Sequence, residues 1–203
     1  MMYDTQNIPL EIIDGLKLDI KYREILQPNE SVTGSDGIEY TLPRFFYKID
    51  SYETARQIKL SPHFYMSEFL RTDFKEEELL REYPKYIPIS VTLIASALEL
   101  FRKKVGTVVL IATNGGYRSP KHSLNNGISP HCWGTAANIY KIGSKHLDNQ
   151  STIEKYSEMM KDVLPGVWIR PYGTKPGTSF DQLHIDLGFT TVFPKQNFNT
   201  IKE

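Results

Sequence analysis

The stretch Ser129-Pro-His-Cys-Trp-Gly-Thr-Ala-Ala-Asn138 carries the densest pattern of chemically useful residues in this sequence. His131 precedes Asn138 by seven positions, and the residues from Gly134 to Ala137 are small. Small side chains let two backbone segments approach each other closely. We therefore take His131 and Asn138 as the starting point of a candidate functional site.

A second histidine of interest lies downstream in Asp181-Gln-Leu-His-Ile-Asp186. Apolar and polar residues alternate here, which predicts a strand over residues 182–187. His184 and Asp186 share one face of such a strand. Asp181 stands where a polar loop meets the strand, so its carboxylate would reach a water held by a metal on His184. An ordinary amphipathic strand is the alternative interpretation.

Arg118 lies in Asn114-Gly-Gly-Tyr-Arg-Ser-Pro120, a glycine-rich turn. The turn follows a β-branched run from Thr107 to Thr113, which predicts a buried strand. Loops at strand ends are where catalytic groups are often mounted. Arg118 is therefore a third candidate for the site.

Four segments in this order resemble the motifs of the zinc D-Ala-D-Ala carboxypeptidases, a family that includes peptidoglycan endopeptidases. The likeness is closest to the small single-domain enzymes of bacteria and phages. It spans about residues 59–190 and implies an α+β fold of the hedgehog/DD-peptidase type, with a central antiparallel sheet and flanking helices. The segments are Ser61-Pro-His-Phe-Tyr-Met-Ser-Glu-Phe-Leu70, Gly116-Tyr-Arg-Ser-Pro120, Ser129–Asn138 and Asp181–Asp186.

Carried over position by position, the resemblance implies a role for each candidate. His131 and His184 would be zinc ligands, and Asn138 takes the place of the family's ligand aspartate. Asp181 would be the general base, and Arg118 would bind or polarise a substrate carbonyl or carboxylate. These roles are chemically consistent, because a catalytic zinc uses three protein ligands and one open position, and a nearby carboxylate can accept the proton of the attacking water.

Asn138 is the departure from the family's pattern. A neutral amide oxygen attracts a dication less strongly than a carboxylate does. Either the site binds zinc poorly and is catalytically silent, or the amide oxygen or another group completes the coordination and activity survives. Cys132 is a substitute ligand by softness, but on an extended backbone its position beside His131 would point it away.

The same resemblance suggests which residues line a substrate pocket. Tyr117 and Ser119 flank Arg118 in the glycine turn and are candidate substrate-binding residues with it. Trp133 either walls the substrate pocket or packs in the core. His122, just after the turn, either lines the cleft or is a solvated helix residue.

Composition narrows the function classes. The 203 residues contain 24 Lys and Arg and 24 Asp and Glu, so the chain has no global basic field of the kind that nucleic-acid binders use. One cysteine excludes an intramolecular disulfide. No apolar run reaches the ~20 residues of a membrane span. The N-terminal residues show no secretory signal, so we expect a cytoplasmic protein unless a phage-type or particle-based route delivers it to the cell wall.

Local patterns divide the chain into three parts. Residues 1–58 form a β-rich N-terminal extension that is open to assembly partners, residues 59–192 the peptidase-like domain, and residues 193–203 a C-terminal tail. Alternation predicts strands at Leu16–Arg23 and at Ile38–Leu42, joined as a hairpin through a turn-rich segment.

Helices are predicted at three places in the domain. A capping box of Asp73 and Glu76 predicts one that stops at Pro84. A second follows Ser90 and ends at Gly106. A capping box of Ser151 and Glu154 opens the third, which ends at Pro165. Strands are expected at residues 107–113, 167–172 and 182–187.

Two functions follow from these expectations. The first is zinc-assisted hydrolysis of an amide bond that involves a D-amino acid, on peptidoglycan or its peptide fragments. The second is a non-catalytic peptidoglycan-binding or structural component of a phage or phage-tail-like particle. The two histidines with Asp181 and Arg118 favour the enzyme, and Asn138 favours the second function.

Overall fold

A central antiparallel sheet organises the protein. The computed structural model describes residues 10–34, 36–125, 127–175 and 177–195, and within them the fold is mixed α+β with five α-helices. The sheet runs in the order β10-β9-β12-β11, with β8 also paired to β9, and all its pairs are antiparallel. Its strands are β8 Val109–Ile111, β9 Ala136–Ile142, β10 Lys145–His146, β11 Trp168–Ile169 and β12 Leu183–Asp186. The predicted α+β class with a central antiparallel sheet is confirmed.

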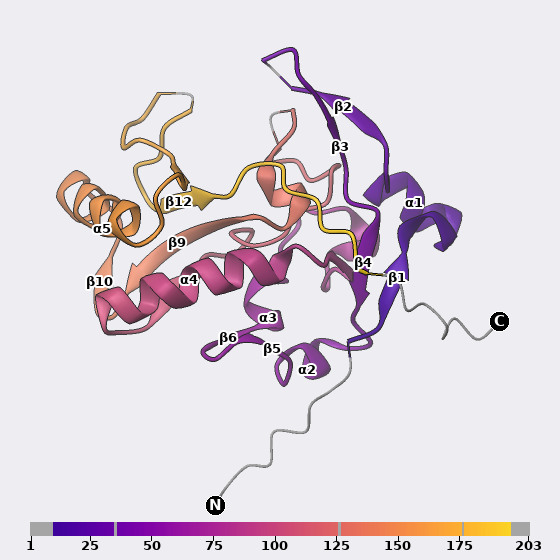
Figure 1. Cartoon of the computed structure of the whole chain (residues 1–203), viewed down its shortest axis with the longest axis horizontal. Coiled ribbons are helices and arrows are strands. Elements are labelled where there is room, and N and C mark those ends of the chain that lie inside the picture. Colours follow the sequence, from indigo (N-terminus) through magenta and orange to yellow (C-terminus); the bar gives the residue numbers. More distant parts are fainter. Residues whose placement is uncertain (1–9, 35, 126, 176, 196–203) are drawn as a thin grey trace, which may run out of the picture.

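Two long helices, α4 (Val91–Val105) and α5 (Gln150–Val163), pack against this sheet (Figure 1). Helix α4 buries Ile94, Leu98 and Phe101, whose spacing places them on one helix face. It ends at Gly106, whose φ of 69° is the left-handed conformation that favours glycine. Both helices were predicted from local pattern alone.

The cap of α5 differs from the prediction. Asn149 caps the helix, because its side-chain oxygen accepts the backbone N–H of Thr152 at 3.1 Å. Ser151 instead donates its hydroxyl to Asn149 at 2.9 Å. The helix therefore begins at Gln150, and the predicted capping box of Ser151 and Glu154 is wrong.

The N-terminal segment contains a helix where alternation predicted a strand. After β1 (Ile12–Asp14) and a short 3-10 turn, helix α1 runs over Ile20–Leu26. Tyr22, Ile25 and Leu26 are buried at helical spacing, whereas Ile20 is exposed. The apolar residues that alternate at residues 16–23 are not all buried on one side, so the strand prediction is wrong there.

The hairpin predicted between residues 16–23 and 38–42 is wrong in its first strand, because a different hairpin forms within the turn-rich segment and the strand after it. Strand β2 (Ser31–Thr33) pairs with β3 (Glu39–Thr41), and this hairpin projects from the top of the molecule (Figure 1). Leu42 and Tyr40 face the neighbouring core, as the alternation required, while Ile38 is exposed.

Short elements connect the N-terminal segment to α4. The predicted helix at residues 73–84 is reduced to a 3-10 turn at Glu78–Leu80, because the Glu76 side chain turns inward to Ser119 instead of capping. The remaining elements are β4 Phe45–Lys48, α2 Tyr52–Ala55, β5 Lys59–Ser61, β6 Phe64–Tyr65, α3 Met66–Phe69 and β7 Tyr86–Pro88.

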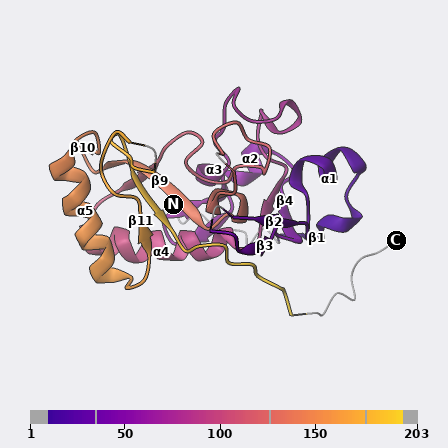
Figure 2. The ribbon, with the colours of Figure 1, turned by 90° about the horizontal axis from the view of Figure 1, so that it is seen from above.

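The N-terminal segment packs into the main core. Strand β4 lies between β1 and β7, and Tyr22 and Phe46 belong to the same buried cluster as Leu98 and Ile139. The chain after β12 runs across to the N-terminal strands (Figures 1 and 2), where Phe189 lies 4.2 Å from Tyr40 between ring centroids. The boundaries at residues 58 and 192 stay predictions. The predicted tail falls largely on residues 196–203, which lie outside the described residues.

Helix length and hydropathy also bear on the membrane. No helix in the described ranges is both long and apolar enough to cross a bilayer. The longest, α4, has 15 residues and carries three basic residues in its last turn. This agrees with the expectation of no membrane span.

Candidate metal centre and its cleft

Neighbouring strands bring Asn138 and His184 together. The register of β9 and β12 pairs them directly, and paired residues project on the same side of a sheet. The Asn138 side-chain oxygen Oδ1 lies 2.6 Å from Nδ1 of His184. Both side chains are almost fully buried. Two residues selected from the sequence as site candidates are therefore in direct contact.

A short 3-10 turn at Pro130–Trp133 supplies the second histidine. Gly134 ends the turn with a φ of 67° and leads the chain into β9. The ring centroids of His131 and His184 lie 5.1 Å apart. Nδ1 of His131 lies 2.6 Å from the carbonyl oxygen of Gly116 and donates to it. Its other nitrogen, Nε2, is buried and has no hydrogen-bond partner in the part of the chain that the structure describes.

The partners of the two rings define which nitrogens carry lone pairs. A carbonyl oxygen only accepts, so Nδ1 of His131 carries the proton and Nε2 the lone pair. On His184, Nε2 lies 3.1 Å from the Asp186 carboxylate, which leaves Nδ1 with the lone pair when the ring is neutral. Each ring thus donates one N–H hydrogen bond, His131 to the Gly116 carbonyl and His184 to the Asp186 carboxylate. Hydrogen bonds of this kind orient histidines that bind metals through their other nitrogen.

Nδ1 of neutral His184 then faces the Asn138 oxygen, and both atoms are acceptors. Two acceptors 2.6 Å apart repel each other unless a cation lies beside them or the amide is turned to donate. Together with the orphaned Nε2 of His131, this donor set fits a small divalent ion with nitrogen and oxygen ligands. The predicted ligand set is thus compatible with zinc.

Burial keeps both rings neutral. Desolvation and the charge of Arg118 hold the pKa of His131 well below its usual value. Desolvation also lowers the pKa of His184, although the hydrogen bond to Asp186 opposes that shift. Neutral imidazoles are the form that binds metals.

A cleft of about 560 Å³ opens beside Asn138, within the ~300–1,000 Å³ range of small-molecule sites. Its wall includes Asp181 and Arg118, so three of the predicted site residues share one cavity. Two further cations, Arg71 and Lys75, also line it. Sequence reasoning missed both, because the pattern around them predicts the start of a helix and contains no binding motif. Three cations against one carboxylate favour an anionic ligand.

Arg118 is held rigidly at the wall of this cleft. It is 8% exposed, and its Nε donates to the carbonyl oxygen of Asn114 at 2.7 Å. Burial lowers the pKa of Arg118 to about 10, which leaves the guanidinium charged at neutral pH. Gly115 makes the tight turn possible, because a Cβ there would lie 2.9 Å from the carbonyl oxygen of Asn138.

The other predicted substrate-binding residues are buried away from the cleft. Tyr117, Ser119 and Trp133 are at most 1% exposed, and none of them lines the cavity. Ser119 is bound to the buried Glu76 carboxylate, which accepts its backbone N–H at 3.0 Å and its hydroxyl at 2.5 Å. We therefore correct their role from substrate contact to support of the turn and core. The sequence predicted a helix-capping role for Glu76, so its contact with Ser119 was not expected.

Trp133 packs with the N-terminal hairpin. Its indole N–H donates to the carbonyl oxygen of Thr41 at 2.9 Å, and its ring lies 4.8 Å from that of Phe189 between centroids. Of the two interpretations of Trp133, packing in the core is the one observed.

Cys132 and His122 both differ from a simple ligand role. The Cys132 sulfur accepts from the side chain of Asn125 at 3.2 Å, and burial raises the pKa of its thiol to about 12. The same sulfur lies 3.8 Å from the carbonyl oxygen of Ser119, so among the described residues the thiol contacts Asn125 and Ser119 rather than the candidate ligands. His122 is 2% exposed, and its Nε2 lies 3.1 Å from the side-chain oxygen of Asn114. It is neither solvated nor on a helix.

Comparisons of the chain with protein-family models, with curated proteins and with solved structures found no match. Among the described residues, no group of three or more His, Cys, Asp or Glu side chains is placed to hold a metal ion. The candidate centre consists of two histidines and one asparagine amide. Its interpretation therefore rests on the geometry around His131, Asn138 and His184.

Proposed function

We propose that this chain has the hedgehog/DD-peptidase fold and that its cleft acts on peptidoglycan stem peptides. The reaction would be hydrolysis of an amide bond next to a D-amino acid. The observation that carries the proposal is the buried, unpartnered Nε2 of His131. The ring of this histidine lies 5.1 Å between centroids from the ring of His184, whose Nδ1 faces the Asn138 oxygen. Leaving such an atom without a partner is unfavourable unless the site receives a ligand.

Each residue has a defined task in this proposal. His131, Asn138 and His184 would hold a zinc ion, and Asp186 and the Gly116 carbonyl orient the two rings. A bound zinc would polarise the scissile carbonyl and acidify a water. Asp181, exposed at the cleft wall, accepts the proton of the attacking water and returns it to the leaving amine.

Arg118 supplies the recognition of substrate. Its Nε is used by Asn114, so its terminal nitrogens remain for a substrate oxygen. A guanidinium offers forked donors to a carboxylate or a carbonyl. Arg71 and Lys75 add positive charge to the same cleft and would attract a peptide that ends in a carboxylate.

A non-catalytic, peptidoglycan-binding or structural role is the second candidate. Asn138 favours it, because turning the amide lets its nitrogen donate to Nδ1 of His184 and closes the pair without a metal. Such a protein would serve in a phage or phage-tail-like particle that works at the wall. It would keep the cationic cleft for binding and lose turnover.

One experiment separates the two candidates. The purified, zinc-supplemented chain is incubated with muropeptides that end in D-alanyl-D-alanine, and the products are analysed by mass spectrometry. If the chain is a peptidase, we expect the wild type to cleave these muropeptides and the His184→Ala variant not to cleave them. Binding of muropeptides without cleavage, weakened by Arg118→Gln, supports the second role. The absence of both cleavage and binding would contradict both candidate functions.

A further inference from the structure

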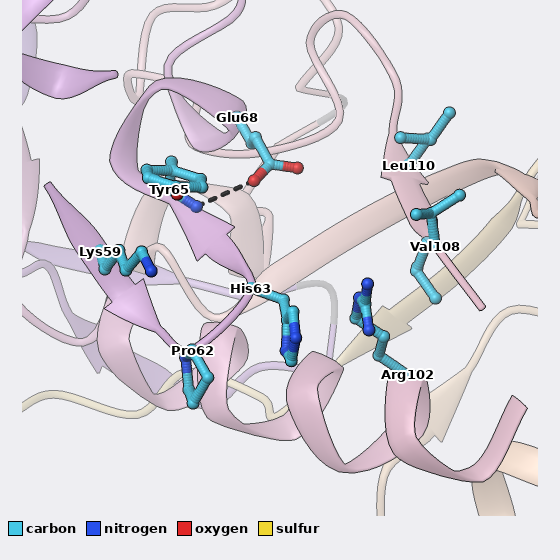
Figure 3. A pocket seen from close by; sticks show the side chains of 9 residues that line it. Lys59, Pro62, His63, Tyr65, Glu68, Arg102, Val108 and Leu110 are labelled. Atoms are coloured by element: carbon cyan, nitrogen blue, oxygen red, sulfur yellow. Dashed lines mark hydrogen bonds between the residues drawn. The ribbon is translucent and has the colours of Figure 1, made fainter. Parts of the chain in front are cut away.

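A second cavity lies away from the candidate metal centre, between the β5–β6 hairpin, α3, α4 and β8 (Figure 3). Its volume is about 340 Å³, at the lower end of the ~300–1,000 Å³ range of small-molecule sites. None of its lining residues lines the larger cleft. Its chemistry can therefore be considered separately from the proposed peptidase.

Two opposite charges line this cavity without pairing. Figure 3 shows the Glu68 carboxylate and the Arg102 guanidinium on different sides of the space. Oε1 of Glu68 accepts the backbone N–H of Tyr65 at 2.8 Å, and its other oxygen has no hydrogen bond within the described ranges. Over those same residues, the Arg102 side chain forms neither a hydrogen bond nor an ion pair.

The neighbouring histidine does not neutralise either charge. Nδ1 of His63 lies 2.6 Å from Oε1 of Glu99, and Oε2 of Glu99 accepts the His63 backbone N–H at 2.9 Å. Glu99 also accepts the hydroxyl of Ser61 at 3.0 Å. These bonds fix His63 as a wall of the cavity and occupy the Glu99 carboxylate. Lys59 adds a second cation to the lining.

The surroundings of Glu68 favour a positively charged partner. Burial raises the pKa of Glu68, because desolvation disfavours its anion, while the Tyr65 hydrogen bond and the charges of Arg71 and Arg102 oppose that shift. An ammonium group beside the free oxygen would restore the interaction that burial removes. The guanidinium, in turn, needs an anionic acceptor.

The rest of the lining is suited to a small aliphatic group. Pro62, Val108, Val109 and Leu110 form an apolar part of the wall. We propose that this cavity binds a small zwitterion, an amino acid or dipeptide with a free amine and a free carboxylate. The amine binds Glu68, the carboxylate binds Arg102 with support from Lys59, and the side chain lies against the apolar wall.

The test is a titration of the ¹⁵N-labelled full chain with D-alanyl-D-alanine. Changes in the chemical shifts of the backbone amides are measured by NMR at each ligand concentration. We expect saturable shifts at Tyr65 and Val109. Glu68→Gln and Arg102→Gln should each weaken binding by about tenfold or more, because each removes one charge-assisted contact. Glu68→Gln keeps an oxygen for the Tyr65 amide, which preserves the local fold. Lys103→Gln, on an exposed residue of the same helix turn, should leave binding unchanged.

Acetate and ethylamine serve as probes with one charge each. One contrary outcome is that acetate shifts the same amides and binds with the same affinity as the dipeptide, while Glu68→Gln leaves the affinity for the dipeptide unchanged. In that case the cavity is an anion site and the inference is wrong. Shifts confined to Gly115 and Arg118 would place the dipeptide in the larger cleft, which supports the proposed peptidase and overturns this inference. The absence of any shift at millimolar ligand also overturns it. Lys59→Gln provides a second variant and should weaken binding less than Arg102→Gln.

Discussion

The side-chain oxygen of Asn138 lies 2.6 Å from Nδ1 of His184, although 46 positions separate the two residues. The register of β9 and β12 sets this contact, and Asp186 holds the far nitrogen of the same ring. An aspartate at position 138 would place a carboxylate next to the lone pair on Nδ1 of His184. A cation between the carboxylate and this nitrogen would then be required to offset their repulsion. With asparagine, the pair either binds a cation weakly or closes through a turned amide.

The first prediction concerns the ligand set. His131→Ala and His184→Ala should each lose bound zinc, because removing one of three ligands leaves too few donors for a stable site. The measurement is the metal content of the purified protein after dialysis against a zinc buffer. His63→Ala is the control and should keep the wild-type content. Stoichiometric zinc in the double variant of His131 and His184 would contradict the proposed centre.

The second prediction concerns Asp181. Asp181→Asn removes the proton acceptor from the cleft wall and should lower amide hydrolysis by ~10²–10⁴-fold. Zinc content and unfolding temperature should stay unchanged, because Asp181 is exposed and is not among the proposed ligands. Turnover of a D-alanyl-D-alanine peptide measures the effect. Wild-type turnover in the variant would leave Asp181 without a catalytic role.

The third prediction uses Asn138→Asp, a nearly isosteric change that restores an anionic oxygen. We expect zinc to bind about tenfold more tightly or better, equivalent to about 1.4 kcal/mol or more. Since a ligand that binds only the folded state stabilises it, zinc should raise the unfolding temperature of this variant more than that of the wild type.

Activity of the same variant separates the two functional candidates. Cleavage that appears only in Asn138→Asp would show that this residue silences an otherwise complete enzyme. Tighter zinc without cleavage would favour the binding or structural role. Equal responses of both proteins to zinc would mean that position 138 does not contact the metal.

The fourth prediction concerns the buried carboxylate of Glu76. Glu76→Ala leaves the Ser119 N–H and hydroxyl without an acceptor, and we expect the free energy of unfolding to fall by about 2–4 kcal/mol. Glu76→Gln keeps one acceptor oxygen and should lose less. Urea denaturation measures both variants, with the exposed Glu82→Ala as the control. Equal urea midpoints for Glu76→Ala and the control would mean that Glu76 does not stabilise the turn that holds Arg118.

The fifth prediction concerns acid sensitivity. Burial and the charge of Arg118 lower the pKa of His122 to about 4 from 6.5, so the unfolded state binds more protons between these values. Stability therefore rises with pH through this window and is lost on acidification, by at most about 3 kcal/mol from this residue.

His122→Gln removes this titration. Urea unfolding of metal-free protein at pH 6.5 and at pH 4 should show a smaller loss in the variant than in the wild type. The remaining loss includes the two other buried histidines, His131 and His184, whose pKa values are also lowered. An identical loss in both proteins would mean that His122 titrates alike when folded and unfolded.

Local sequence determined the elements whose burial follows a simple period. Helix α4 and strand β12 were predicted because Ile94, Leu98 and Phe101 repeat at helical spacing and Leu183 and Ile185 alternate. The period of a strand also placed His184 and Asp186 on one face, where they hydrogen-bond. Such predictions need only neighbours in the chain.

Tertiary structure alone decided the features that depend on distant partners. Glu76 had the spacing of a helix cap but binds Ser119, 43 positions away, and that contact outweighs a weak local signal. The strand predicted around Ile20 became a helix for a related reason. Tyr22 packs edge-on against Tyr86 of β7, and the helix buries Tyr22, Ile25 and Leu26 on one face. Arg71 and Lys75 joined the cleft only through the folding of their loop, since no local pattern encodes which surface a loop will meet.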